Sequence, residues 1–115
     1  MWWTVAGIVG ALGVALGAFG AHGLKGVVTD AHLLEVWETA ARYHLLHALA
    51  LCAVAAHPKT PTVSGVAFVV GIVLFSGSLY TMTLTDARWL GAITPLGGVA
   101  LIVGWIGLAV ASTRP

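Results

Sequence analysis

Charged residues are scarce in this chain. Its 115 residues include five Lys or Arg and four Asp or Glu, which is 8% of the chain, whereas a soluble domain carries about 25%. So few charges exclude an ordinary soluble globule and an intrinsically disordered chain. The formal net charge of +1 excludes a nucleic-acid-binding protein, which needs a basic surface to neutralise phosphates.

Cysteine is almost absent as well. Cys52 is the single cysteine, so no intramolecular disulfide can form. Cysteine usage therefore does not indicate whether the protein faces an oxidising or a reducing compartment.

Long apolar runs are what the chain does have. Four stretches contain no Lys, Arg, Asp or Glu, namely 1–24, 43–58, 60–85 and 89–113. About 20 apolar residues span a bilayer as a helix, and runs such as 66–70 do not alternate as barrel strands would. The sequence therefore predicts an all-α membrane protein. The chain is expected to be a four-transmembrane-helix bundle in one domain, 1–115, with helices at about 2–24, 38–57, 62–84 and 91–111.

Four spans place both termini on one side of the membrane, here called side A. The loops 25–37 and 85–90 then lie on the opposite side, side B. The first loop is apolar, and Asp30 can cap a helix that starts near Ala31. We expect a short interfacial helix there, between the first and second spans and running into the second span.

Glycines form a stripe along the first run, at Gly7, Gly10, Gly13, Gly17 and Gly20. Spacings of three or four place them on one helix face, where small residues let two helix backbones approach closely in lipid. A signal peptide is the alternative, but the run has no basic residue before Lys25. We expect the segment to be retained as a packing helix.

Helix direction alternates along the chain, so the depth of a residue in the membrane follows from its position in its run. By this criterion most polar side chains within the runs lie toward side B. These residues are His22, Tyr43, His44, His47, Ser76, Ser78, Tyr80 and Thr94. Polar groups in hydrocarbon need partners, so they should face the bundle interior. One interpretation is a hydrogen-bond network that fixes the helices, and the other is a site for a ligand, a metal or protons.

Three of these residues, His22, His44 and His47, are the candidate metal ligands. Haem between two helices would need only two imidazoles at one depth. No CxxC, HExxH or ligating carboxylate accompanies them, so a structural, hydrogen-bonded role is favoured and no cofactor is predicted. Haem or a metal is kept as the lesser alternative.

Two further patterns have simple interpretations. Glu38 and Arg42 are spaced i, i+4 with the acid first, which is typical of an ion pair on a helix surface, here at the membrane interface. Ser76-Gly77-Ser78 lacks the GxSxG elbow of a hydrolase, so we expect no catalytic residue there.

Several motifs together resemble one small membrane family. They are Gly17–Leu24, Tyr43–Leu51, Phe75–Tyr80, Thr94–Gly98 and Gly104-Trp105. This order and coverage resemble domain of unknown function family 423, to which the eukaryotic transmembrane protein 256 is related. The resemblance implies a compact multi-helix protein, located in the cytoplasmic (inner) membrane of bacteria. It implies no reaction.

The functional expectation is a non-enzymatic membrane protein that acts as an oligomer or as an accessory subunit of a membrane complex. The alternative is a membrane module that binds haem, a metal or a lipophilic molecule at the His/Tyr/Ser cluster. A small transporter comes last, because no inverted repeat is visible.

Overall fold

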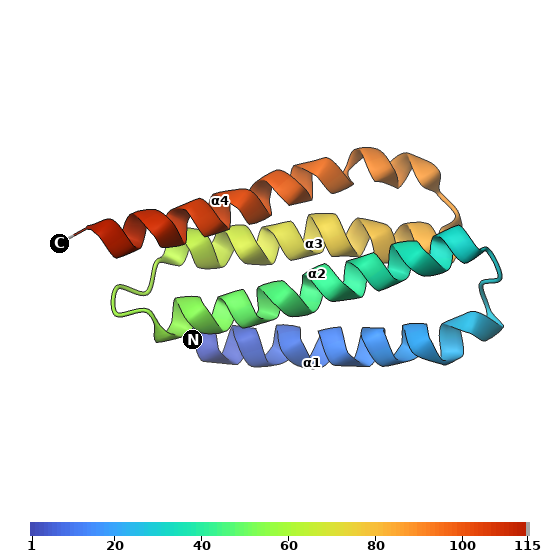
Figure 1. The fold of residues 1–115 in the computed structure, drawn as a ribbon, viewed down its shortest axis with the longest axis horizontal. Helices are drawn as coiled ribbons and strands as arrows, with labels where there is room; N and C mark the ends of the chain where they lie inside the picture. The colour runs from blue at the N-terminus through green and yellow to red at the C-terminus, as the bar shows by residue number, and fades with distance from the viewer. Residues whose placement is uncertain (115) are drawn as a thin grey trace.

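The structure is a computed structural model, and it describes residues 1–114. Its four long helices are α1 (Trp2–Ala21), α2 (Ala31–Ala56), α3 (Thr62–Thr85) and α4 (Thr94–Thr113). Each is long and apolar enough to cross a membrane, and residues 1–114 contain no strand. The expected all-α fold with four candidate spans is confirmed. Both termini lie at one end of the molecule and the loops 22–30 and 86–93 at the other (Figure 1).

The helices form an up-and-down array in chain order, with the long contacts between α1 and α2, α2 and α3, and α3 and α4. The molecule measures 52 × 26 × 17 Å, so it is a thin layer. Helices α2 and α3 lie inside it and bury more of their surface than α1 and α4, which flank them.

Helix α2 corrects one expectation. It runs unbroken from Ala31 to Ala56, so within residues 1–114 the helix that starts near Ala31 is the first part of the second span and not a separate interfacial helix. The span begins seven residues before the expected position 38. The Asp30 carboxylate caps this helix by accepting hydrogen bonds from the backbone N–H groups of His32 (2.9 Å) and Leu33 (3.4 Å). A helix of this length measures about 39 Å, so its first turns project beyond a hydrocarbon layer of about 30 Å on side B.

The ends of the outer helices also differ from the expected ranges. Helix α1 ends at Ala21, because the backbone of His22 leaves the helical region (φ −127°, ψ −79°). A 3-10 turn, η1 (Gly23–Gly26), follows it. A second 3-10 turn, η2 (Arg88–Ala92), precedes α4, which begins at Thr94 rather than 91.

The glycine stripe of α1 faces α2 at four of its five positions. A Cβ at Gly13 would lie 2.7 Å from Leu45 Cδ2, and one at Gly20 would overlap the ring of Trp37. Gly10 and Gly17 have room for a Cβ, at 3.9 Å from Ala48 and Ala41 respectively, and Gly7 has open space around it. Close approach therefore depends on two of the five glycines.

A second glycine seam joins α4 to α3. A Cβ at Gly97 would overlap the backbone nitrogen of Phe75, and one at Gly104 would overlap the ring of Phe68. At Gly97 the atoms nearest to an added Cβ are backbone atoms of α3. The backbones of α3 and α4 are therefore in direct contact at this glycine.

Two apolar clusters fill the interior. The cluster toward side A contains Trp2, Leu51, Val54, Phe68 and Leu101, among others. The cluster toward side B contains Leu24, Leu33, Trp37, Leu79 and Met82, among others. The two buried histidines of α2 lie between these clusters.

Candidate functional site

His44 links three helices at mid-height of the layer. Its ring is buried, and its Nε2 lies 2.8 Å from the backbone oxygen of Val9 on α1. Its Nδ1 lies 3.0 Å from the phenol oxygen of Tyr80 on α3. Val9 is near the middle of α1, so His44 lies deeper than the side B position expected from the sequence.

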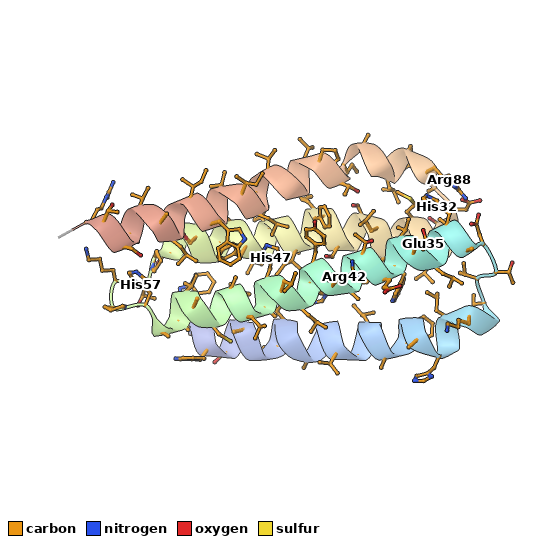
Figure 2. All side chains as sticks on the ribbon, viewed as in Figure 1. His32, Glu35, Arg42, His47, His57 and Arg88 are labelled. Atoms are coloured by element: carbon orange, nitrogen blue, oxygen red, sulfur yellow. The ribbon has the colours of Figure 1, made fainter. Side chains whose placement is uncertain are left out.

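His47, one turn further along α2, contacts the fourth helix. Trp105 on α4 donates a hydrogen bond from its indole N–H to Nε2 of His47, at 3.0 Å. Nδ1 of His47 lies 2.7 Å from the backbone oxygen of Tyr43. The ring is buried, and Phe68 lies edge-on against Trp105 beside it. Figure 2 shows His47 between α2 and the helices α3 and α4.

These partners define the tautomer of each ring. An indole N–H can only donate and a carbonyl oxygen can only accept, so His47 is protonated on Nδ1. The carbonyl of Val9 requires a proton on Nε2 of His44, whose Nδ1 accepts from the Tyr80 hydroxyl in the neutral form. The two histidines are thus opposite tautomers, and all four ring nitrogens have partners within the chain. Metal ligation would require breaking one of these bonds, because a ligand nitrogen needs a free lone pair.

The hydroxyl residues make separate contacts between neighbouring helices. Ser76 donates to the backbone oxygen of Ala40 on α2 at 2.8 Å. Ser78 and Thr94 join α3 to α4 through a hydroxyl pair at 2.7 Å. Among residues 1–114 no hydrogen bond joins these two contacts to either histidine, so the expected cluster is a set of small groups distributed over four helix interfaces.

His22 lies apart from the other predicted site residues. It is exposed at the end of α1, and the structure does not bring it to His44 or His47. Within residues 1–114, no three His, Cys, Asp or Glu residues are grouped so that they could hold a metal ion. Tyr43 is partly exposed, at 39%, and its ring packs on Phe75 with centroids 4.6 Å apart.

The Glu38–Arg42 pair lies on the surface of α2, with one nitrogen–oxygen distance of 3.3 Å. The side chains are 73% and 60% exposed, respectively. An ion pair this exposed contributes little to stability, so most of the hydrogen-bonding capacity of both groups is available to other molecules.

Three interhelical donors were not predicted. Trp105 appeared only within a motif, Trp37 donates to the backbone oxygen of Leu16 at 2.8 Å, and Thr83 donates to the backbone oxygen of Leu33 at 3.2 Å. Trp37 lies outside the charge-free runs, and a threonine within a run can have many roles, so position alone gave no signal for these two residues. Trp105 lies far from both ends of its run, and an indole N–H at that depth needs an acceptor.

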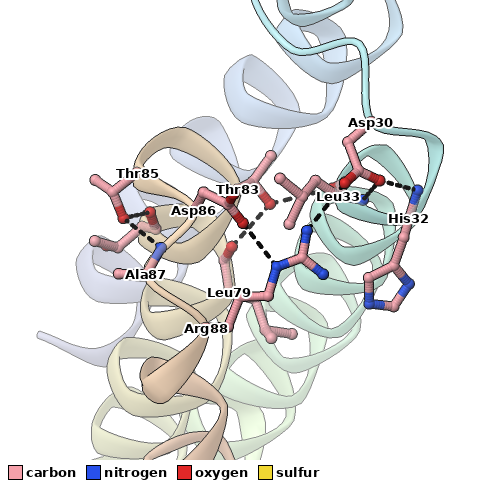
Figure 3. A network of polar contacts seen from close by, with 10 residues as sticks. Asp30, His32, Leu33, Leu79, Thr83, Thr85, Asp86, Ala87 and Arg88 are labelled. Atoms are coloured by element: carbon pink, nitrogen blue, oxygen red, sulfur yellow. Dashed lines mark hydrogen bonds and ion pairs between the residues drawn. The ribbon is translucent and has the colours of Figure 1, made fainter.

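An ionic contact at the side B end was also not predicted. Arg88 reaches Asp86 from its Nε at 2.7 Å and Asp30, the cap of α2, from its Nη2 at 2.9 Å. Figure 3 shows this guanidinium between the two carboxylates. The backbone N–H of His32, together with Arg88, holds the pKa of the Asp30 carboxyl below its ordinary value. The contact ties the loop before α4 to the start of α2.

Four apolar helices, with their polar side chains directed toward one another, define a polytopic integral membrane protein. The model of the protein of unknown function family DUF423 matches residues 16–98. That match covers more than half of the chain, so the chain belongs to the DUF423 family, as its motifs indicated.

Relatives of the chain are named as membrane proteins. It is 50% identical over 109 residues to the UPF0382 membrane protein YwdK of Bacillus subtilis, covering 90% of this chain and 88% of that one. It is 46% identical to SAB0533 of Staphylococcus aureus, over 93% of both chains. A fission yeast relative, C1782.12c of Schizosaccharomyces pombe, is 42% identical over 110 residues, which cover 90% of this chain and 93% of that one. No solved structure matches the chain.

The names of these relatives and the four apolar helices establish an integral membrane location. The bacterial relatives agree with the expected inner membrane of bacteria.

Proposed function

We propose that this protein is a non-catalytic membrane component that works as an oligomer or as an accessory subunit of a larger membrane complex. The observation that carries the proposal is how the buried polar groups are used. Both buried histidines bond to neighbouring helices through their ring nitrogens, and the buried serines and threonine of the side B half bond to protein oxygens.

One buried hydroxyl differs. Among residues 1–114, Ser64 Oγ is the buried side-chain polar atom without a hydrogen-bond partner. It lies against Gly107 of α4, far from either histidine in the sequence and toward side A.

The shape of the molecule supports assembly. In a layer 17 Å thick, α1 and α4 each have one long helix contact and direct many large apolar side chains outward. In the described part of the chain the buried polar side chains other than Ser64 bond within the protein, so the outer apolar surfaces are what the protein offers to partners. Helices associate in lipid through van der Waals packing, and apolar outer surfaces allow such packing.

Native mass spectrometry after gentle extraction from its own membrane tests the proposal. We expect a stoichiometric assembly, either of identical chains or with other membrane proteins. A population of single chains under these conditions would contradict it.

The same spectra test the cofactor alternative, in which His44 or His47 holds haem, a metal or a lipophilic molecule. That alternative requires an added mass that disappears in the His44→Ala or the His47→Ala variant. A matched variant, His57→Ala, changes an imidazole in the side A turn and should leave the mass unchanged in either case.

A further inference from the structure

A groove runs between α1 and α2 at the side B end of the layer, on the outer surface. Its volume is about 490 Å³. Small residues, including Gly17, Ala21 and Ala41, form part of its lining, and Leu34 and Leu45 extend its apolar wall. The part of the groove lined by these small and apolar residues, here called its floor, suits a hydrocarbon chain.

The groove lies at the depth of lipid headgroups. Gly17 is opposite Ala41 and Gly20 is opposite Trp37, so the groove follows the last turns of α1, which ends at Ala21. Twenty helical residues cover about 30 Å, which matches the hydrocarbon thickness of a bilayer. The groove therefore crosses the boundary between hydrocarbon and headgroups.

Charged side chains of both signs line the groove. Lys25 and Arg42 supply two positive charges, and Glu35 and Glu38 supply two negative charges, so four of the nine charged residues of the chain meet at this one place. Figure 2 shows Glu35 and Arg42 on the same stretch of α2.

These charges are little used within the protein. Arg42 contacts Glu38 through one of its five N–H donors at 3.3 Å. In the described part of the chain, 1–114, neither Lys25 nor Glu35 takes part in an ion pair. These side chains are therefore available for charge-assisted hydrogen bonds to a ligand of matching charge.

We propose that this groove binds one phospholipid with an ethanolamine headgroup. The phosphodiester accepts hydrogen bonds from Arg42 and Lys25, as phosphates do from guanidinium and ammonium groups. The primary ammonium of the headgroup donates to Glu35 and Glu38, and an acyl chain lies along the floor beside Gly17 and Ala41. The equal numbers of positive and negative side chains match a zwitterion.

Other headgroups fit less well. A glycerol headgroup carries the phosphate but no cation, so Glu35 and Glu38 would face a lipid of their own sign. A choline headgroup carries a cation without N–H donors, so the carboxylates would lose their hydrogen bonds.

The test is a lipid titration of the delipidated full chain, followed by native mass spectrometry. Ethanolamine, glycerol and choline phospholipids with identical acyl chains are compared. We expect one ethanolamine lipid per chain, bound about tenfold more tightly than the other two, because charge-assisted hydrogen bonds are at stake. Equal binding of all three lipids would overturn the proposal.

Variants separate the two halves of the headgroup. Glu35→Gln removes a carboxylate that makes no ion pair in the protein, so folding should be unaffected and the preference over the glycerol lipid should fall. Arg42→Gln should weaken binding of the ethanolamine and glycerol lipids alike.

Two control variants change charge outside the groove. Asp86→Asn neutralises an acid on side B, and Lys59→Gln neutralises a base on side A. Both should keep the preference of the unmodified chain. A preference that is unchanged in Glu35→Gln and Arg42→Gln, or lost equally in the controls, would contradict the assignment of the groove.

Discussion

Trp105 determines how His47 is used. Its indole N–H points at Nε2 of His47, and because this group can only donate, it fixes the proton of His47 on the other nitrogen. The contact is a side chain-to-side chain hydrogen bond between α2 and α4, whose helices otherwise meet little. Its contribution should therefore be measurable as a pairwise coupling.

We predict that Trp105→Phe lowers the free energy of unfolding in mixed micelles. Interhelical hydrogen bonds in membranes contribute about 0.6 kcal/mol on average, up to about 1.7, so a double-mutant cycle with His47→Phe should give a coupling in that range. Trp89→Phe is the matched control, because Trp89 is 69% exposed. A coupling of zero would contradict the hydrogen bond.

Asp30 gives the chain a titration at the side B end. The His32 N–H and Arg88 hold the pKa of its carboxyl below the ordinary value of 3.8. A lowered folded-state pKa means that the ionised form stabilises the fold above the unfolded pKa. That stabilisation is lost as the pH falls through the folded pKa.

The prediction is that the backbone amide signals of His32 and Leu33 shift together on acidification, with a midpoint below 3.8. Nuclear magnetic resonance in micelles measures this. Asp30→Asn keeps a side-chain oxygen for the cap but cannot titrate, so the shared shift should vanish. A midpoint at or above 3.8 would show that the cap and the Arg88 contact do not act on this carboxyl.

At the scale of elements, the α3–α4 seam is the most demanding contact. Gly97 faces the backbone of Phe75, which cannot rotate away as a side chain can. Gly98, its neighbour, has Phe75 Cδ2 at 3.9 Å from the position of an added Cβ. The two glycines therefore differ in what a methyl group would meet.

Gly97→Ala should destabilise the protein by about 2–3 kcal/mol, since the helices must separate to admit the methyl group. Gly98→Ala should be neutral, or stabilising by up to about 1 kcal/mol through helix propensity. Unfolding titrations of both variants give the comparison. Equal stabilities would show that the seam is looser than the structure has it.

The α1–α2 seam should respond less. Gly13→Ala pushes against the side chain of Leu45, which can move, so we expect a loss of about 1 kcal/mol. Gly7→Ala meets nothing within 4 Å and should be neutral, or stabilising by up to about 1 kcal/mol through helix propensity. A larger loss at Gly7 than at Gly13 would mean that α1 packs on α2 through a different face.

Most of the architecture follows from the sequence, because apolar runs of membrane length leave few alternatives. The charge-free runs gave four helices and the shared side of the termini. They failed at the start of α2, where the second run was extended from 43 only to 38, although the helix capped by Asp30 has 26 residues and enters the span without a break. Run boundaries report where charge begins, and helix boundaries depend on capping.

The site was less predictable than the fold. Burial of His44 and His47 follows from their depth, but their partners depend on the rotation of each helix, which hydropathy does not encode. The rule that glycines on one helix face permit close packing was applied to α1 only. Gly97 and Gly104 are seven residues apart and also share one face of α4, so the same rule could have predicted the α3–α4 seam. His22 was grouped with His44 and His47 because all three were expected toward side B, but the structure leaves His22 exposed at the end of α1.

At the scale of the whole molecule, α2 is the centre of the polar contacts. Through His44 it bonds to α1 and α3, and through His47 it bonds to α4. Two imidazoles on one helix thus reach all three neighbours in a layer whose outer helices hardly meet. These bonds connect the helices in addition to the packing of the two apolar clusters, and they support the structural role proposed for both histidines.

The most direct test of that claim is the protonation of the two rings, read from nitrogen-15 spectra of the histidines in bilayers. The account predicts opposite neutral tautomers, with the proton on Nε2 in His44 and on Nδ1 in His47, unchanged when haem or a divalent metal is added. A shared tautomer, or a ring nitrogen that shifts on addition of the metal or haem, would contradict the structural role and favour a ligand site.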